Sequence, residues 1–492
     1  MALNNASINS SQRSPVAIAE GDGIGPEIMA ATLAIIQAAD APLDLRHITI
    51  GEQVYKSGNT SGIPDEAWDV IRETGVMLKA PITTPQGGGY KSLNVSIRKT
   101  LGLFANIRPC VAYHPFTATN FPGMDLVVVR ENEEDTYGGI EHQQTPEVVQ
   151  CLKLITWPGS LRLCQYAFAY AKAHGRNKVT CFVKDNIMKQ SDGLFRKAFE
   201  QVAKQYPELE SDVMIIDIAA ARIATHPEMF DVIVAPNLYG DIVSDIAAEV
   251  AGRVGLVGTA NIGPTCAMFE AIHGSAPDIA GQGIANPSGL LLAAVQMLQY
   301  LGHSECAAKV HNAWLCSIED GMHTGDIYQE SLSKQRLGTM GFAQAVIERL
   351  GKTPGTLKPA IGGVTRIETP EPAKPSPTDQ QLVGVDVFLH WDPSERDPDV
   401  LGRVLTACVS PEFTLTMVSN RGTKVWPSGA PETFCTDHWR CRFTPAEQQI
   451  PMSQTKVIEL LTLLDHGGLQ IIKTENLYTF DSKAGYSLGQ GE

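Results

Sequence analysis

Two carboxylates four residues apart are the first feature of this sequence with an obvious chemical use. Asp241 and Asp245 stand in the polar stretch 237–245, which follows the β-branched run 230–235. The run predicts a buried strand, and residues 241–250 favour a helix. Both acids would then lie on one face of the first helical turn, where they could hold a hard cation.

A purely structural explanation competes with the metal hypothesis. Acids are favoured near helix N-termini, so Asp241 could be an N-cap and Asp245 a surface acid. A further acid, Asp217, ends another apolar run, and this favours the metal. Because no His or Cys is near in the sequence, the oxygen ligands indicate Mg²⁺ or Mn²⁺ rather than zinc.

Side chains that suit an anionic substrate come earlier in the chain. Three consecutive glycines, 87–89, allow the backbone to approach a ligand, and polar residues follow them. Guanidinium groups can grip carboxylates through two parallel hydrogen bonds, so several together predict a polycarboxylate site, although each alone is compatible with a surface ion pair. The candidates are Ser92, Asn94, Arg98, Arg108 and Arg130.

Two further residues could exchange protons with a substrate. Tyr137 stands beside two glycines, and a phenol near cations can have its pKa lowered enough to donate or accept a proton. Lys184 ends the predicted strand 179–183, and a lysine there could pass protons if it lay close to the substrate. A plain surface lysine is the alternative reading.

Length and composition limit the classes of protein that fit. The 492 residues suggest two to four domains, and a net charge of −15 argues against nucleic acid or an anionic membrane as main partner. Ten cysteines without a CxxC pair predict a reducing, cytoplasmic location. No apolar run reaches the roughly 18 residues that span a bilayer. Residues 1–14 lack the apolar core of a secretory signal, and a short organelle-targeting peptide stays open.

A glycine-rich turn near the N-terminus resembles a dinucleotide-binding loop but has the wrong spacing. Residues 21–26 read Gly-Asp-Gly-Ile-Gly-Pro between a predicted strand at 15–20 and a helix that ends near Ala39. The pattern is GxGxGP rather than GxGxxG, and the proline suits the first helical position. We therefore expect a tight turn and place no cofactor there.

Six motifs together resemble the β-decarboxylating dehydrogenases of isocitrate and isopropylmalate, and most closely those that oxidise isocitrate. They cover roughly residues 15–352 in family order: GDGIGPE, TTPxGGGxxSLNVxxR, RENxEDxYxGIE, KxNIMK, NLxGDxxSD and HGSAPDIAGxGxANP. The resemblance implies the α/β fold of this family rather than a Rossmann fold, with a large domain, a small domain and a clasp. It also implies oxidative decarboxylation of isocitrate to 2-oxoglutarate, a reaction of the tricarboxylic acid cycle, in a homodimer with shared active sites.

The resemblance assigns roles to the residues above. Asp241 and Asp245 would hold Mg²⁺ or Mn²⁺, with Asp217 contributed by the neighbouring subunit. Lys184 would help remove the C2-hydroxyl proton, and Tyr137 would protonate C3 after decarboxylation. The residues implied to bind isocitrate are Ser92, Asn94, Arg98, Arg108 and Arg130.

The implied cofactor is NAD. In this family a loop embraces the adenosine, and Asp278 would accept hydrogen bonds from ribose hydroxyls while repelling a 2′-phosphate. NADP-dependent relatives have Lys-Tyr where this chain has Asp278 and Ile279, and the downstream positions Gly325 and Gln329 supply no cation. The implied cofactor residues are Thr83, Thr84, His273, Gly274, Ala276, Asp278, Ile279 and Asn286.

The domain boundaries follow from the motifs and from a change in composition. We expect a large domain at 15–102 and 252–352, and a small domain at 103–251 with the dimer clasp near 137–160. A proline-rich linker at 353–381 would precede a ferredoxin-like α+β domain at 382–492, built as βαβ followed by βαβ. That last domain could serve subunit association or bind a regulatory ligand, and association is favoured.

Two alternatives to isocitrate oxidation stay open. The same arginine cage could accept homoisocitrate or another 3-substituted malate with a longer arm. A non-catalytic regulatory subunit is also possible in this family, but it would be expected to lack Tyr137, Lys184 or a metal acid, and all are present.

Overall fold

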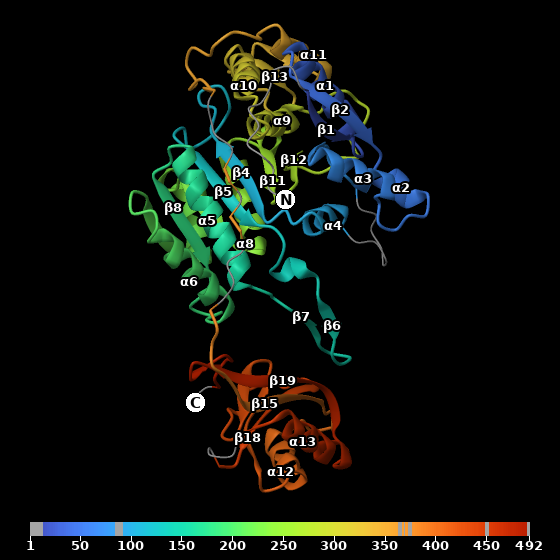
Figure 1. Ribbon diagram of the computed structural model, residues 1–492, viewed down its shortest axis with the longest axis vertical. Coiled ribbons are helices and arrows are strands. Elements are labelled where there is room, and N and C mark those ends of the chain that lie inside the picture. The colour runs from blue at the N-terminus through green and yellow to red at the C-terminus, as the bar shows by residue number, and fades with distance from the viewer. Residues whose placement is uncertain are drawn as a thin grey trace. The chain divides into compact units, whose positions relative to one another are not determined.

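The chain folds into two compact units, described here from a computed structural model (Figure 1). One unit comprises Met1–Tyr137 and Leu154–Ala373, and the other comprises Gly138–Lys153 and Lys374–Glu492. The structure describes residues 13–83, 92–362, 367–368, 370–371, 376–447 and 452–489.

A ten-stranded mixed sheet forms the centre of the first unit, in the order β2-β1-β3-β12-β11-β4-β5-β10-β8-β9. Strand β11 is antiparallel to both its neighbours and β4 is antiparallel to β5, whereas the other neighbouring strands are parallel. In sheet order the strands are Leu43–Ile48, Ser14–Ala19, Val76–Lys79, Ala267–Ala271, Gly258–Ile262, Ala105–Val111, Asp125–Glu131, Val232–Ala235, Lys178–Val183 and Glu210–Ile215.

The sheet is buried on both faces, which explains its nearly continuous apolar strands. In β5, Val127 and Val129 pack into the core on one face, while Leu126 and Val128 pack on the other. This alternation follows from the two-residue period of side chains along a strand. Each face therefore needs its own layer of helices.

Helices α1, α5, α6, α9, α10 and α11 supply the core on one face, and α3, α4, α7 and α8 supply two smaller cores on the other. In Figure 1, α1, α9, α10 and α11 of the first group lie at one end of the sheet, and α5 and α6 lie at the other. In chain order from α1 to α11, with the short α2, the helices are Gly25–Ala38, Glu52–Lys56, Asp65–Thr74, Leu93–Thr100, Trp157–Ala173, Ser191–Ala203, Ile216–Thr225, Asn237–Ala251, Ser288–Tyr300, Ser304–Glu319 and Thr339–Ile347. A small parallel pair adds β13 (Met322–Thr324) and β14 (Gln335–Leu337).

Helix α8 begins four residues before the predicted start. Asn237 is its first residue, so Asp241 and Asp245 lie beyond the first turn and neither is an N-cap. The sequence also predicts a sharp turn at Gly240, just before the expected helix. Gly240 instead lies inside α8, where a Cβ would come within 2.6 Å of Cγ of Arg130. The glycine therefore allows α8 to pack closely on strand β5.

The second unit combines a hairpin with a six-stranded antiparallel sheet in the order β17-β16-β18-β15-β19-β20. Omitting β17 and the terminal β20, the succession β15-α12-β16-β18-α13-β19 and its strand order are ferredoxin-like, as predicted. Its separate core is centred on Trp439, which is fully buried. The elements are β6 Glu141–Gln143, β7 Val149–Cys151, β15 Gln380–His390, α12 Pro398–Cys408, β16 Phe413–Asn420, β17 Thr423–Trp426, β18 His438–Pro445, α13 Gln454–His466, β19 Gln470–Phe480 and β20 Lys483–Ala484.

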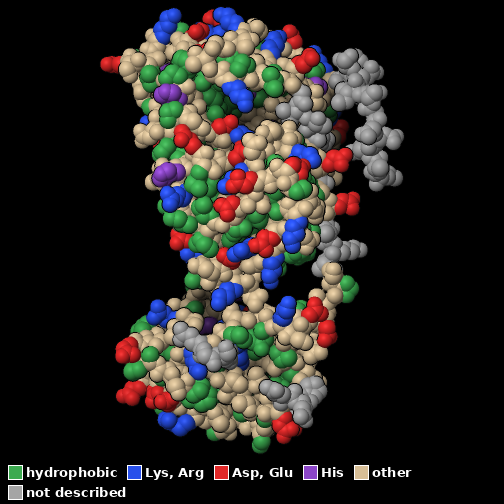
Figure 2. Space-filling model, turned by 90° about the vertical axis from the view of Figure 1, so that its left-hand side faces the viewer, with side chains coloured by type: hydrophobic (Ala, Val, Ile, Leu, Met, Phe, Trp, Pro, Cys, Tyr) green, Lys and Arg blue, Asp and Glu red, His purple; other side chains and the backbone are tan. Residues whose placement is uncertain are grey.

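The surface seen in Figure 2 intersperses Lys and Arg with Asp and Glu rather than gathering charges of one sign. In the portion of the chain that is described, no helix is both long enough and apolar enough to cross a membrane.

Candidate active site

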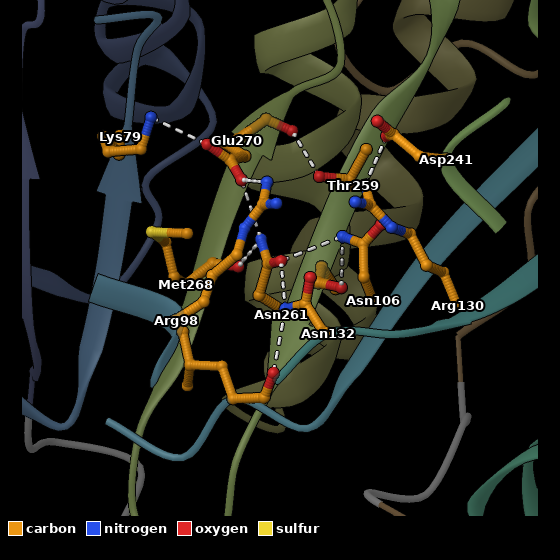
Figure 3. Close-up of polar contacts among 12 residues, drawn as sticks. Lys79, Arg98, Asn106, Arg130, Asn132, Asp241, Thr259, Asn261, Met268 and Glu270 are labelled. Carbon is orange, nitrogen blue, oxygen red and sulfur yellow. Dashed lines mark hydrogen bonds and ion pairs between the residues drawn. The ribbon is translucent and has the colours of Figure 1, made fainter. Parts of the chain in front are cut away.

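One face of the central sheet carries polar side chains from five neighbouring strands, β3, β12, β11, β4 and β5 (Figure 3). In each strand they alternate with apolar residues of the main core; in β4, for example, Ala105 and Ile107 face that core. The alternation places the polar residues together on the opposite face, between the α3/α4 and α7/α8 layers. They are Lys79, Glu270, Asn261, Asn106, Arg108 and Arg130, and all are buried.

Arg108 and Arg130 converge on the carboxylate of Asp241. Nη1 of Arg130 donates to Oδ1 of Asp241, and Nη2 of Arg108 lies 3.2 Å from the same oxygen. Asn237 fixes Arg130, because its carbonyl oxygen accepts from Nε at 3.0 Å and its Oδ1 accepts from Nη2 at 2.7 Å. Burial, reinforced by the positive charge of Arg108, lowers the pKa of Arg130 to about 9.

Asp241 and Asp245 differ in ionisation because they differ in partners. Burial alone would raise the pKa of Asp241, but Arg130 and Arg108 outweigh it, so the pKa lies below the usual value. Among the described residues, Asp245 forms its ion pair with Arg108 alone, 3.3 Å from Oδ1, and burial raises its pKa. Asp241 therefore stays ionised to a lower pH than Asp245 does.

Tyr137 joins this cluster, as predicted from its position in the sequence, but its ionisation differs from the expectation. Its hydroxyl donates to Oδ2 of Asp241 at 2.5 Å, and Arg130 lies over its ring at 4.9 Å from the centroid. Burial and the hydrogen bond to Asp241 raise its pKa, against the lowering effect of Arg130. The phenol therefore keeps its proton at neutral pH.

The two aspartates fit a divalent metal that retains other ligands. They lie at i and i+4 on α8, and both carboxylates point to the arginine cluster. Within the described ranges, no three His, Cys, Asp or Glu residues come together as a complete metal site. Two carboxylates supply what Mg²⁺ or Mn²⁺ ordinarily takes from protein, and substrate oxygens and water can complete the shell.

Arg98 is held by an ion pair with the buried carboxylate of Glu270. Its Nη2 donates to Oε1 of Glu270 at 2.8 Å, and Lys79 contacts the other carboxylate oxygen at 2.7 Å (Figure 3). Asn261 also donates to Glu270, at 3.0 Å. Burial acts to raise the pKa of Glu270, but Lys79 and Arg98 outweigh it and hold the pKa well below its usual range.

Asn94 and Arg98 present polar atoms that no described residue satisfies. They stand one turn apart on α4, and both Oδ1 of Asn94 and Nε of Arg98 are buried without a hydrogen-bond partner among the described residues. Buried polar atoms are nearly always paired, so these two indicate a ligand position. Ser92 is the exposed N-cap residue of the same helix and makes no capping hydrogen bond.

Lys184 and Asp217 pair with each other instead of joining the cluster. Nζ of Lys184 lies 2.7 Å from Oδ1 of Asp217, and the two side chains are 26% and 68% exposed. In the described structure neither forms a hydrogen bond or ion pair with Asp241 or Asp245. Asp217 follows the apolar run and lies in the first turn of α7, which begins at Ile216, and its hydrogen bond to Lys184 lowers its pKa.

A separate cavity of about 660 Å³ is lined by five of the predicted cofactor residues. Its polar wall includes Asn286, which donates to Asp326 at 2.9 Å. Burial lowers the pKa of His273, so the imidazole is neutral at pH 7. Thr83 does not line the cavity but hydrogen-bonds Ser275 at 2.7 Å, and Thr84 lies outside the described residues. The five are His273, Gly274, Ala276, Ile279 and Asn286.

The cavity wall contains an arginine that sequence reasoning missed and lacks the aspartate that it emphasised. Asp278 is exposed and is not among the lining residues, whereas Arg336 of β14 is. A Cβ at Gly325 would stand 2.9 Å from Nη2 of Arg336, so this guanidinium fills the space that a side chain at 325 would occupy. Among the residues that the structure describes, no acid forms an ion pair with Arg336, so its charge is available to a ligand.

Several other members of the site also escaped sequence reasoning. For four of them the missed signal was a charged or amide residue at an alternate position inside an apolar strand, since such a residue is rarely buried without a purpose. These four are Lys79, Asn106, Asn261 and Glu270. Asn237, at the start of α8, was quoted as part of a motif but given no role, and the exposed Arg336 carried no such signal.

Comparison with known proteins identifies both units. A family model described as isocitrate/isopropylmalate dehydrogenase matches residues 15–346, and one described as the bacterial isocitrate dehydrogenase C-terminal domain matches residues 380–492. A Rickettsia bellii protein named isocitrate dehydrogenase (NADP) is 50% identical over 488 residues, which cover 97% of this chain and 99% of that protein. A Thermus thermophilus protein of the same name is 41% identical, with 98% and 96% of the two chains covered.

Solved structures agree with the predicted fold. A protein from Thermus thermophilus superposes with a TM-score of 0.91 at 41% identity, over 98% of this chain and 96% of that one. Isocitrate dehydrogenase from Methylococcus capsulatus gives 0.65 at 40% identity, over 68% of this chain and 99% of that one. The prediction of a family fold distinct from Rossmann, with an added C-terminal domain, is confirmed.

The prediction of NAD as cofactor is corrected by the same comparisons. Six relatives, 41–50% identical over 97–98% of this chain, carry NADP in their names. The physical error was to judge the loop by Asp278, which lies outside the cavity, and to miss Arg336, which lies in its wall.

Proposed function

The chain belongs to the isocitrate/isopropylmalate dehydrogenase family, and on that premise we propose that it oxidises isocitrate at C2 and releases CO₂ to form 2-oxoglutarate. One observation carries the proposal: Arg108 and Arg130 meet at a pair of metal-compatible aspartates, and the charge of Arg98 also acts on Asp241. Among the described residues, Asn94 and Arg98 on α4 also have buried polar atoms without a partner. A substrate with three carboxylates matches this set of charges. The names of the relatives support the same substrate.

The residues divide the work of binding and proton transfer. Arg98, Arg108 and Arg130 bind the substrate carboxylates, and the buried position of Arg130 excludes water from that contact. Tyr137 holds a proton beside Asp241 and delivers it to C3 once CO₂ has left. When bound at the aspartates, Mg²⁺ or Mn²⁺ would polarise the C2 oxygen and the adjacent carboxylate.

Lys184 and Asp217 complete the site of a second copy in a homodimer. Their exposed pair has no hydrogen bond or ion pair to the aspartates of its own described chain, which supports action in trans. Mixing Lys184→Met with Tyr137→Phe tests this, because a heterodimer would regain one intact site in two. Co-expressed chains should recover about a quarter of wild-type activity, whereas no recovery would refute sharing and leave the single-chain assignments standing.

Isocitrate turnover is tested by steady-state kinetics in Mg²⁺ or Mn²⁺. We expect oxidation of isocitrate, and a higher kcat/KM for it than for homoisocitrate. A preference for homoisocitrate would move the substrate assignment to the longer acid. Failure with both acids and with both nicotinamide cofactors would refute the function.

The cofactor is NADP, which accepts the hydride from C2. Arg336 supports this, because a guanidinium in the cavity wall without an acid partner among the described residues can bind the 2′-phosphate. We expect kcat/KM to favour NADP, and Arg336→Ala to reduce that preference by at least about tenfold, or about 1.4 kcal/mol. Lys334→Ala is the matched control, since Lys334 is exposed, lies two residues away and does not line the cavity.

Binding without turnover separates the cofactor from the catalytic assignments. By calorimetry, 2′,5′-ADP should bind the wild type more tightly than 5′-AMP does, and Arg336→Ala should remove the difference. Equal binding of the two nucleotides by the wild type would refute the phosphate site. Loss of the difference in Lys334→Ala would show that general charge, rather than Arg336, causes it.

A further inference from the structure

The hairpin of residues 138–153 is held by the C-terminal domain within the second unit. Its tip contacts the loop before α12 and the segment before β18. The bidentate pair between Glu147 and Arg396 is the first contact, with Nη2 to Oε1 at 2.8 Å and Nη1 to Oε2 at 3.0 Å. Arg396 is itself fixed by Asp392, which accepts from its Nε at 2.8 Å, so the guanidinium is preorganised for the hairpin.

A second contact is buried. The hydroxyl of Thr145 donates to Oδ1 of Asp437 at 2.6 Å, and the two residues are 5% and 1% exposed. The backbone N–H of Asp437 also donates to Glu147, at 3.2 Å. An acid that is 1% exposed requires its donors, so the C-terminal domain is built to receive this hairpin tip.

The hairpin has little means of fixing itself. Strands β6 and β7 have three residues each, and Val149 is 66% exposed. An isolated two-stranded hairpin of this kind is marginally stable in water. Within its own chain, the hairpin is therefore stabilised by the C-terminal domain that contacts its tip.

The hairpin also continues directly from a residue of the active site. Tyr137 and Gly138 share a 3₁₀ turn, and Leu152 donates to the carbonyl of Ile140 at 3.0 Å to close the hairpin base. Gly139 has φ +64 and no described atoms near its side-chain position, so local sterics restrain this joint weakly. The hairpin that follows is therefore a source of restraint on the backbone after Tyr137.

We propose that the C-terminal domain is a positioning device for catalysis, in which Arg396 and Asp437 restrain Tyr137 by gripping the hairpin tip at Glu147 and Thr145. The inference rests on the proposed function because Tyr137 is its proton donor. It gives the C-terminal domain a role within its own chain. Without the grip, Tyr137 would leave its donor position more often and proton delivery would slow.

A charge reversal with rescue tests the inference in the full-length protein. Arg396→Glu should repel Glu147, accelerate amide exchange in 138–153 by roughly tenfold, and lower kcat by about fivefold or more. The KM for isocitrate should change by less than about twofold, because the substrate arginines are untouched. The double variant Glu147→Arg with Arg396→Glu re-forms the ion pair but lacks the acceptor for the backbone N–H of Asp437, so it should restore most of the loss in exchange and in kcat.

Lys456→Glu is the matched control, because it breaks a comparable surface pair with Glu412 elsewhere in the same domain. It should leave both exchange in the hairpin and kcat unchanged. Thr145→Val gives a second route, removing the donor to Asp437 while keeping the side-chain shape. If hairpin exchange is unchanged in Arg396→Glu, the grip is refuted; if exchange rises while kcat holds, or the double variant fails to rescue, the positioning role is refuted. A wild type without isocitrate turnover would refute the proposed function, and the exchange measurements would still decide the grip.

Discussion

Replacing Glu270 by glutamine should lower the free energy of unfolding of the first unit by about 3–5 kcal/mol, because it removes the charge of one partner from a buried ion pair. Glu270 contacts Lys79 at 2.7 Å and Arg98 at 2.8 Å, and the Lys79 side chain is only 1% exposed. Glutamine preserves the shape and an acceptor for Asn261, so the loss is mainly electrostatic. The free energy comes from leaving the lysine charge buried without an acid.

Removing the lysine as well should recover much of that loss. In Lys79→Met with Glu270→Gln no lysine charge is left buried without an acid, and we expect the free energy of unfolding to return to within about 1–2 kcal/mol of the wild type. Arg98 would still lack its carboxylate in both variants. The KM for isocitrate should therefore stay raised in the double variant although its stability recovers.

The pH dependence gives an independent check. The folded-state pKa of Glu270 lies below its unfolded value, so its stabilisation is complete above the unfolded pKa and is lost as pH falls through the folded one. Urea unfolding should show the full gap between wild type and Glu270→Gln at pH 7, and a smaller gap below about pH 4.5. A double variant no more stable than Glu270→Gln, or a gap independent of pH, would refute the ion-pair argument.

Three further substitutions probe the same region. Burial raises the folded pKa of Glu131 to about 8, so the free energy of unfolding of the wild type falls as pH rises from about 4.5 to 8. In urea unfolding, the stability of Glu131→Gln relative to the wild type should rise by up to about 4 kcal/mol over that range. The same pH dependence in both proteins would contradict this. Gly240→Ala places a Cβ 2.6 Å from Cγ of Arg130 and should raise the KM for isocitrate by roughly tenfold; an unchanged KM would show that α8 can shift freely. Asn237→Ala removes the side-chain acceptor of Arg130 and should cost about 1–3 kcal/mol of unfolding free energy, with thermal unfolding as the check.

Local patterns predicted the C-terminal domain well because each of its elements shows its own periodicity. The sequence patterns predict a helix at 398–409 and strands at 413–419 and 469–474. Helix α12 and strand β16 begin at the predicted residues, Pro398 and Phe413. Strand β19 runs on to Phe480 because its C-terminal half pairs with the start of β15 rather than following an apolar pattern. Cross-strand pairing of this kind is decided by the fold and leaves little trace in a single segment.

Single candidate substrate residues could be proposed from the sequence, whereas contacts between several strands could not. Arg98, Arg108 and Arg130 were proposed from their side-chain chemistry, and the structure brings Arg108 and Arg130 together at Asp241. Their supports, Lys79 and Glu270, become neighbours only because β3 and β12 pair in a register that joins these two residues. Without the strand order, nothing in the sequence shows that residue 79 meets residue 270.

Gly240 in helix α8 was recognised as a position that needs glycine, but the reason given for the glycine was wrong. Gly240 was expected to turn the chain, since glycine tolerates turn geometry. The helix instead runs through it, and the missing side chain lets α8 approach strand β5 closely enough for Asp241 to reach Arg130. The glycine thus serves packing, and through packing it sets the distance between acid and base.

Asp241 and Asp245 pair with the arginines of the cluster and are also the proposed ligands of the metal, and this double use determines which ligands the proposed site can bind together. Without substrate, Asp241 neutralises both Arg108 and Arg130, and Asp245 contributes to Arg108. A divalent cation drawn to the same two acids would compete with those arginines, and their charge would then lack a counterion in a buried setting. A substrate carboxylate is the group that can supply one. On the proposed function, the site would therefore favour metal and polycarboxylate together over either alone, because each compensates the charge that the other leaves exposed.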